Sequence, residues 1–214
     1  MSGFPQTTEF NKRIPKQKFY ENMEISLALK RVFVEQIKLI HWRNKIAPAT
    51  LNIAPGQVVN EIEVIEIKLN QQSLDEAVLR QIDKKIPYHI LFILSYGNKV
   101  QAWTGYKETA KSDSKAFKVN KYYHTDWMPE DELSLEITGL NIDAVWENLV
   151  IQVGNVEIAE GNTLAEQIQQ DEERQKILKQ IDKLEAQARR ETNPRKKFEL
   201  VQKAKNLAQK ILPK

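Results

Sequence analysis

Residues 61–96, EIEVIEIKLNQQSLDEAVLRQIDKKIPYHILFILSY, contain the pattern that decides the fold. A strand pattern over 58–69 is followed by a helix pattern over 74–85, and a second β-rich run covers 88–96. Gly97-Asn98 then separates this run from a third one at 100–106, which is typical of a β-hairpin. Because strands and helices do not alternate strictly, this part of the chain does not predict a doubly wound fold.

The flanking residues add further elements of both kinds. A helix is expected over 25–42, with Ser26 as a candidate cap, and another over 141–153. Further strands are expected at 50–53, 116–124 and 133–137. The sequence therefore predicts an α+β domain with a mixed or mostly antiparallel sheet and flanking helices.

The C-terminal segment has a different composition. Residues 163–190 lack Gly and Pro and carry a narrow apolar stripe, Asn193-Pro194 interrupts it, and a second helix is expected up to Ile211. A stripe this narrow does not stabilise an isolated helix, so the segment is expected to form a helical hairpin or coiled coil. Ile177, Ile181 and Leu184 are the predicted partner-binding residues, for a second protein or a second copy of the chain.

Three regions are expected on these grounds: a basic N-terminal arm over 1–22, the α+β core over 23–155, and the charged helical pair over 163–214. Within the 214 residues there is no cysteine, which excludes disulfides and thiol catalysis. The first residues have no apolar signal-like stretch, and no run approaches 18 apolar residues. A cytoplasmic protein with no membrane partner is expected.

Charge is unevenly distributed along the chain. Residues 1–45 carry a net charge of +5, residues 46–170 one of −8 and residues 171–214 one of +6. Basic ends of this kind suit a phosphate-rich or acidic partner, although lysine-rich helices also simply present solvated faces. The candidate DNA-binding residues are Lys12, Arg13, Lys16, Lys18, Arg43, Lys45, Arg195, Lys196 and Lys197. Aromatic residues beside cations at 42–45 and 118–127 are compatible with single-strand binding as well as with a packed sheet edge.

The most specific chemical pattern is Glu66-Ile67-Lys68. On a strand both side chains fall on one face, and with the following helix and strand they resemble the E-x-K half of a PD-(D/E)xK nuclease site, which binds Mg²⁺. The preceding strand, expected at 50–53, offers only Asn52 where such nucleases place an aspartate. The apolar face also switches within 62–69, which indicates either a β-bulge at Val64-Ile65 or a strand buried on both faces.

Other catalytic signatures are missing from the sequence. It contains neither of the Gly-rich phosphate-binding loops and no GxSxG motif. His41, His89 and His124 are far apart and have no metal-ligand spacing, so no metal site is predicted from them.

Several segments in combination are similar to one family. They are residues 10–20, 33–38, 42–48, 86–91, 103–108 and 122–127, together with the charged C-terminal helix, and they resemble the family called domain of unknown function 4391. The resemblance carries no catalytic residues over, but it implies proteins encoded beside DNA methyltransferases and helicases of restriction-like or defence clusters. We therefore expect a non-catalytic accessory subunit that contacts helicase or methyltransferase subunits and DNA. The alternative is a Mg²⁺-dependent nuclease centred on Glu66 and Lys68; otherwise no cofactor is expected.

Overall fold

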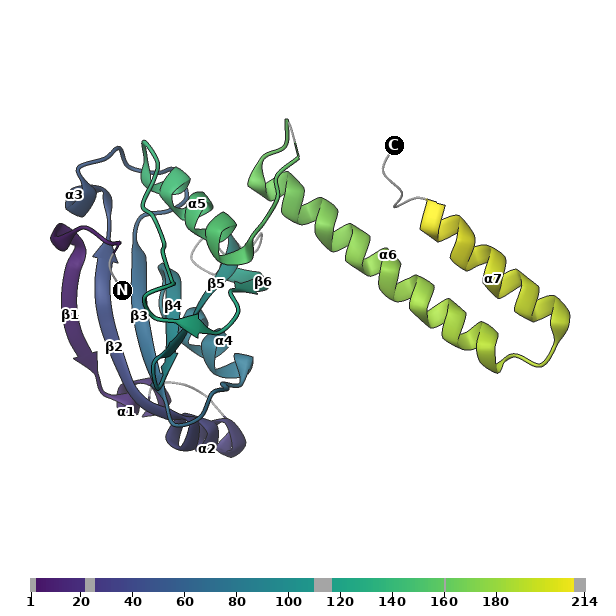
Figure 1. Cartoon of the computed structure of the whole chain (residues 1–214), viewed down its shortest axis with the longest axis horizontal. Helices are drawn as coiled ribbons and strands as arrows, with labels where there is room; N and C mark the ends of the chain where they lie inside the picture. The colour runs from purple at the N-terminus through teal and green to yellow at the C-terminus, as the bar shows by residue number, and fades with distance from the viewer. Residues whose placement is uncertain (1–2, 22–25, 110–116, 160, 210–214) are drawn as a thin grey trace. The chain divides into compact units, whose positions relative to one another are not determined.

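The computed structural model describes residues 3–21, 26–109, 117–159 and 161–209. The chain divides into two compact units, residues 1–156 and 157–214, and each is described by itself. The first unit is built around a seven-stranded sheet in the order β1-β2-β3-β4-β5-β6, with the short β7 paired to β5 (Figure 1). Its strands are β1 (Glu9–Ile14), β2 (Ile37–Ile46), β3 (Ile62–Leu69), β4 (His89–Tyr96), β5 (Lys99–Thr109), β6 (Phe117–His124) and β7 (Met128–Pro129).

The sheet is mixed, as the sequence predicts. β3 and β4 are parallel and are joined by the crossover helix α4 (Glu76–Lys85), whereas the other neighbours pair antiparallel. The remaining helices of this unit are α1 (Lys16–Glu21), α2 (Leu27–Gln36), α3 (Pro48–Leu51) and α5 (Ile142–Gly154), with a short 3₁₀ turn η1 (Gln6–Thr8). The α+β class is therefore confirmed.

Both faces of the sheet are covered by helices. On one face α2 and α4 pack on a cluster that includes Phe33, Ile65 and Phe92, all at most 1% exposed. On the other face lies α5, whose Trp146 ring meets the ring of His89 at the start of β4, with centroids 4.8 Å apart. Because His89 pairs with Ile62, the even-numbered residues of β3 belong to this second face.

Three local predictions are wrong, and two of them have a physical reason. The helix expected over 25–42 ends at Gln36, and Ile37 begins β2. The three-residue spacing of Ile37 and Ile40 is typical of a helix, but a register shift between Ile37 and Leu39 places both on one face of the strand, in the core. The strand expected over 50–53 is the one-turn helix α3, which Asn52 ends in the left-handed conformation with φ 54°. The strand expected at 133–137 is irregular chain, whereas Ser26 caps α2 and Asn141 caps α5.

The switch of the apolar face in β3 is explained by burial on both faces. β3 keeps an unbroken register with β4, so it contains no bulge on that side at Val64-Ile65. The register shift nearest to Val64-Ile65 lies in the neighbouring strand β2, between Trp42 and Asn44, and makes Arg43 the extra residue. This placement turns Arg43 toward the carboxylate of Glu66.

The second unit is an antiparallel helical pair, α6 (Leu164–Arg190) and α7 (Pro194–Gln209). Thr163 begins α6 with a capping box, since it accepts a bond from the Glu166 backbone N–H and Glu166 in turn accepts from Thr163. The seam is made with small residues, because Ala188 and Ala204 are the buried ones along the facing stretches. Such a seam lets the two helices approach closely but buries little apolar area.

Candidate functional site

Glu66 lies in a row of paired residues that crosses three strands. Arg13 of β1 pairs with His41 of β2, and His41 pairs with Glu66 of β3. Directly paired residues project from the same face of a sheet, so these side chains share the face on which α5 lies. The sheet brings together residues from positions 13, 41 and 66 that the sequence pattern alone does not connect.

The carboxylate of Glu66 is held by three neighbours. The Ser95 hydroxyl donates to its Oε1 at 3.0 Å, and Lys68 Nζ lies 3.9 Å from the same oxygen. Arg43 Nη1 is 3.6 Å from Oε2. Glu66 is buried (7% exposed), whereas the side chains of Arg43 and Lys68 are 34% and 49% exposed, so the cations face solvent above an inner carboxylate.

A small polar hollow adjoins Arg43 at the edge of the sheet. It measures about 240 Å³ and is lined by Phe4, Glu9, Asn11, Arg43 and Asn44. Asn11 adopts a left-handed backbone (φ 50°) and its amide donates to Glu9 at 3.2 Å. Three cations, Arg13, Arg43 and Lys68, share this face with the single carboxylate of Glu66, so the surface formed by β1 to β3 is positively charged there. Glu9 adds an acidic side chain at the hollow.

The arrangement does not fit the metal site of a PD-(D/E)xK nuclease. The order β2, β3, α4 and β4 and the shared face of Glu66 and Lys68 match such a site. The strand beside β3, however, places His41 opposite Glu66, and Arg43 fills the space next to its second oxygen. Among the described residues no group of three or more His, Cys, Asp or Glu could hold a metal ion. A divalent cation would have to displace Arg43 and would find one carboxylate.

A second carboxyl cluster lies on the opposite face at the start of β3. Glu63 is 2% exposed and Glu61 is 8% exposed, and Lys45 Nζ lies 2.6 Å from Glu61. Burial, followed by the hydrogen bond that the protonated Glu63 donates to the neighbouring Glu61, raises the pKa of Glu63 to about 9. The hydrogen bond to Glu61 raises the pKa of Lys45. Glu63 is thus protonated at neutral pH, and this cluster is a neutralised part of the packed interior.

The predicted DNA-binding residues are not all placed on one surface. Lys16 donates to the backbone carbonyls of Val34 and Ile37 and so caps the C-terminal end of α2. Lys45 is paired with Glu61. Lys12 lies over the Phe10 ring at 4.3 Å, and Lys18 is in α1. Of the nine, Arg13 and Arg43 lie on the face of Glu66, whereas Arg195, Lys196 and Lys197 are exposed in the first turn of α7.

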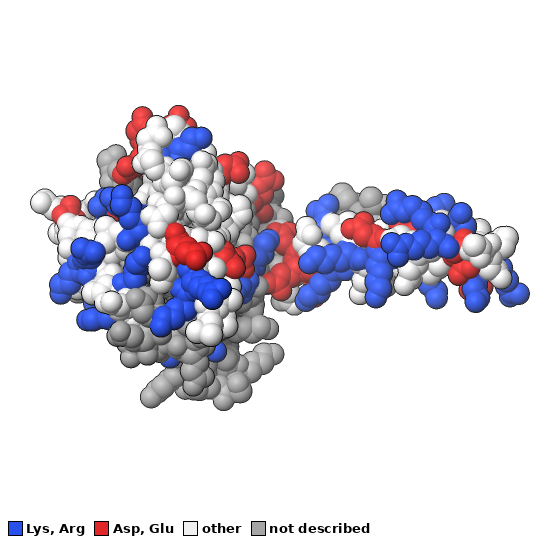
Figure 2. Space-filling view, turned by 90° about the horizontal axis from the view of Figure 1, so that it is seen from below, with Lys and Arg blue, Asp and Glu red and all other residues white. Residues whose placement is uncertain are grey.

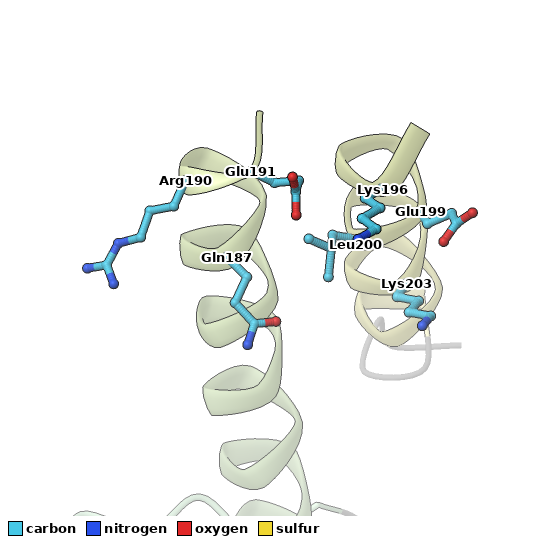
Figure 3. A pocket seen from close by; sticks show the side chains of 7 residues that line it. All are labelled: Gln187, Arg190, Glu191, Lys196, Glu199, Leu200 and Lys203. Carbon is cyan, nitrogen blue, oxygen red and sulfur yellow. The ribbon is translucent and has the colours of Figure 1, made fainter. Parts of the chain in front are cut away.

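Two grooves run along the helical pair. The one near the turn measures about 520 Å³, and Figure 3 shows Leu200 pointing from α7 toward α6 while Arg190 points away from α7. The other measures about 340 Å³ and is lined at its base by Ile181, Ala188, Val201, Ala204 and Ala208. The predicted partner-binding residues Ile177, Ile181 and Leu184 are half-buried within this unit.

Sequence reasoning misses part of the site for one reason. Ser95 meets Glu66 only because β4 is parallel to β3 and places Ser95 beside Lys68, and register is not visible in a strand pattern. The sequence pattern places His41 in a helix and Arg43 just beyond it, so it cannot locate either residue opposite β3. The enrichment of β-branched and aromatic residues over 37–46 is the signal available.

The fold and the site define a mixed-sheet α+β protein with a charged C-terminal helical pair. A family model described as a domain of unknown function (DUF4391) matches residues 3–211, and the chain belongs to this family. No curated protein and no solved structure gives a significant match to the chain. Within the described part of the chain, every helix is too short or too polar to cross a membrane.

Proposed function

We propose that this protein is a non-catalytic accessory subunit of a helicase–methyltransferase system with a restriction-like or anti-phage role. In this proposal the sheet surface around Arg43 contacts the phosphate backbone of DNA. The observation that carries it is the pairing of Glu66 with both Arg43 and Lys68. Glu66 brings Arg43 and Lys68 from neighbouring strands together, and both side chains stay partly exposed, so their charges can reach phosphate oxygens.

The non-catalytic part of the proposal is supported by the same geometry. In a metal-dependent nuclease the carboxylate oxygens bind the cation, and a lysine lies near the attacking water. Here Ser95 and Lys68 contact one oxygen of Glu66, and Arg43 faces the other. Arg43 thus supplies the positive charge that a metal would supply, and a guanidinium cannot activate water as a metal ion does.

The choice of partner rests on family membership. The resemblance implies neighbouring helicase and methyltransferase subunits, and a subunit without chemistry of its own needs such partners in order to act. Co-purification of the tagged chain from its native operon tests this part: capture of a helicase or a methyltransferase is the expected result. Repeated capture of neither would contradict it.

The DNA contact is tested by removing the three cations of the sheet surface. We expect the variant Arg13→Gln/Arg43→Gln/Lys68→Gln to bind a fluorescein-labelled DNA duplex more weakly in fluorescence anisotropy. The slope of log affinity against log salt should fall by about 0.9 for each phosphate that the variant no longer neutralises. Glutamine keeps a donor near Glu66, so the fold should be retained.

A matched control removes the same charge elsewhere in the first unit. Arg31, Lys84 and Lys99 are exposed on α2, α4 and β5 and do not belong to the row through Glu66. The variant Arg31→Gln/Lys84→Gln/Lys99→Gln should keep most of the affinity and of the salt slope. An equal loss in both triple variants would show that net charge, and not this surface, governs binding.

A further inference from the structure

An apolar groove and an exposed aromatic side chain lie on the same unit of this protein. The groove of about 340 Å³ runs between α6 and α7, with Ile181 and Val201 half-buried along it. Phe198 is 64% exposed and stands three residues before Val201, so the two share a side of α7. A large exposed aromatic residue beside an open apolar groove is typical of an interface.

The charges of this unit are separated into two blocks. Residues 157–173 carry six Asp or Glu and no Lys or Arg. Residues 174–214 carry thirteen Lys or Arg and four Asp or Glu. Figure 2 shows Lys and Arg side chains over much of the visible face of the helical pair. An acidic block and a basic block on one unit are complementary to the same unit in the opposite orientation.

The spacing of these features along the helices agrees with a two-fold arrangement. Glu172 lies eighteen residues before the end of α6 and Ile181 nine residues before it, which is about 27 Å and about 13 Å from the turn. A two-fold axis at Ile181 would therefore place the acidic run of one copy beside the basic turn of the other. The same operation places Phe198, about 6 Å from the turn, beside Ala208, which is about 21 Å from it.

We propose that two copies of the chain associate antiparallel through their α6–α7 pairs. In this four-helix arrangement each Phe198 covers the groove at the partner copy's Ala208, and Ile181 lies at the axis. Asp171 and Glu173 of one copy, which flank the side of α6 that carries Ile181, pair with the basic first turn of α7, 195–197, of the other. The interface is isologous, so every contact occurs twice. The proposal assigns Arg195, Lys196 and Lys197 to a protein contact, and DNA binding to the sheet surface alone.

The apolar contact is tested by sedimentation velocity of the full chain over a range of concentrations. The native chain should show a concentration-dependent dimer, and Phe198→Ser should weaken it about tenfold to a hundredfold. Because Phe198 is exposed, the variant should stay folded. The control is Leu140→Ser, which removes a 90% exposed side chain from the first unit and should leave the dimer unchanged. A chain that is monomeric throughout, or a dimer that tolerates Phe198→Ser, would overturn the proposal.

The charge contact is tested by a swap. The triple variants Asp171→Lys/Glu172→Lys/Glu173→Lys and Arg195→Glu/Lys196→Glu/Lys197→Glu should each dimerise more weakly than the native chain. Combining all six substitutions in one chain should restore the dimer, because the interface is then complementary again. The two triple variants mixed together should also pair. Absence of rescue in both experiments would rule out the antiparallel copy.

A DNA partner at the same surface would give a different pattern. It would appear as a monomer whose DNA affinity falls when Arg195, Lys196 and Lys197 are neutralised, and this result would overturn the dimer. The outcome is independent of the proposed function, since that proposal is tested through Arg13, Arg43 and Lys68. If no dimer forms but the Arg13, Arg43 and Lys68 variant loses DNA affinity, only the dimer proposal is refuted. If the dimer forms but that variant keeps its DNA affinity, only the DNA-binding proposal is refuted.

Discussion

The two units of this protein differ in how they bury apolar surface. In the first unit both faces of the sheet are covered, and β3 and β4 are buried almost throughout. In the helical pair, the buried residues among those described are Leu164, Ile168, Ala188 and Ala204. The first unit therefore contains a complete hydrophobic core, whereas the second stabilises itself weakly and leaves Phe198 exposed. A unit of the second kind gains most from binding a partner.

The largest expected effect separates the stability of the two units. Phe92→Ala should lower the free energy of unfolding of the first unit by about 3–5 kcal/mol, the usual cost of such a cavity. Leu184→Ala, at a half-buried site on α6, should leave that unit unchanged within about 0.5 kcal/mol. All four tryptophans lie within residues 1–156, so their fluorescence reports the first unit and circular dichroism at 222 nm reports the helices of both.

Urea titrations followed by both signals would check this comparison. If Leu184→Ala moved the tryptophan transition, the two units would unfold together, and the contrast between a self-sufficient core and a dependent helical pair would fail.

A smaller effect concerns pH and tests the buried carboxyl of the first unit. The pKa of Glu63 is raised in the folded chain to about 9, above its ordinary value of 4.5, so unfolding at neutral pH releases a proton. The contribution of Glu63 to the free energy of unfolding should therefore be greatest below about pH 4.5 and should fall as the pH rises toward 9. The slope for one proton cannot exceed about 1.4 kcal/mol per pH unit.

Glu63→Gln removes this ionisation and should flatten the dependence between pH 5 and pH 9. Thermal unfolding followed by tryptophan fluorescence would measure it. A native chain with equal stability at both ends of this range would show that Glu63 is not held protonated by its burial.

The sequence predicts the first unit better in some parts than in others. The helix 74–85 and the hairpin at Gly97-Asn98 have clear periodicity and turn residues, and both are present with ends within three residues of the prediction. The helix predicted to continue through 37–42 is wrong because the three-residue spacing of Ile37 and Ile40 is typical of a helix, whereas a register shift after Ile37 places both on one face of β2. Tertiary pairing with β3 decides between them, and a sequence pattern does not contain that information.

The candidate site shows the same limit more strongly. The shared face of Glu66 and Lys68 follows from the two-residue period of a strand and is seen in the structure. The pairing of Glu66 with Arg43 depends on the irregular register of β2, and its bond from Ser95 depends on the parallel pairing of β4. Side-chain contacts within one strand could be predicted from the sequence, whereas contacts between strands could not.

The substitution Glu66→Gln tests the central claim most directly, because the two interpretations of this site predict opposite results. If Arg43 and Lys68 bind phosphate, removing the neighbouring negative charge should raise the affinity for a DNA duplex about two- to fivefold in fluorescence anisotropy. Glutamine has the shape of glutamate and can still accept the bond from Ser95, so the fold should be retained. A Mg²⁺-dependent nicking activity in the native chain that Glu66→Gln abolishes, or a DNA affinity that does not rise, would contradict the account.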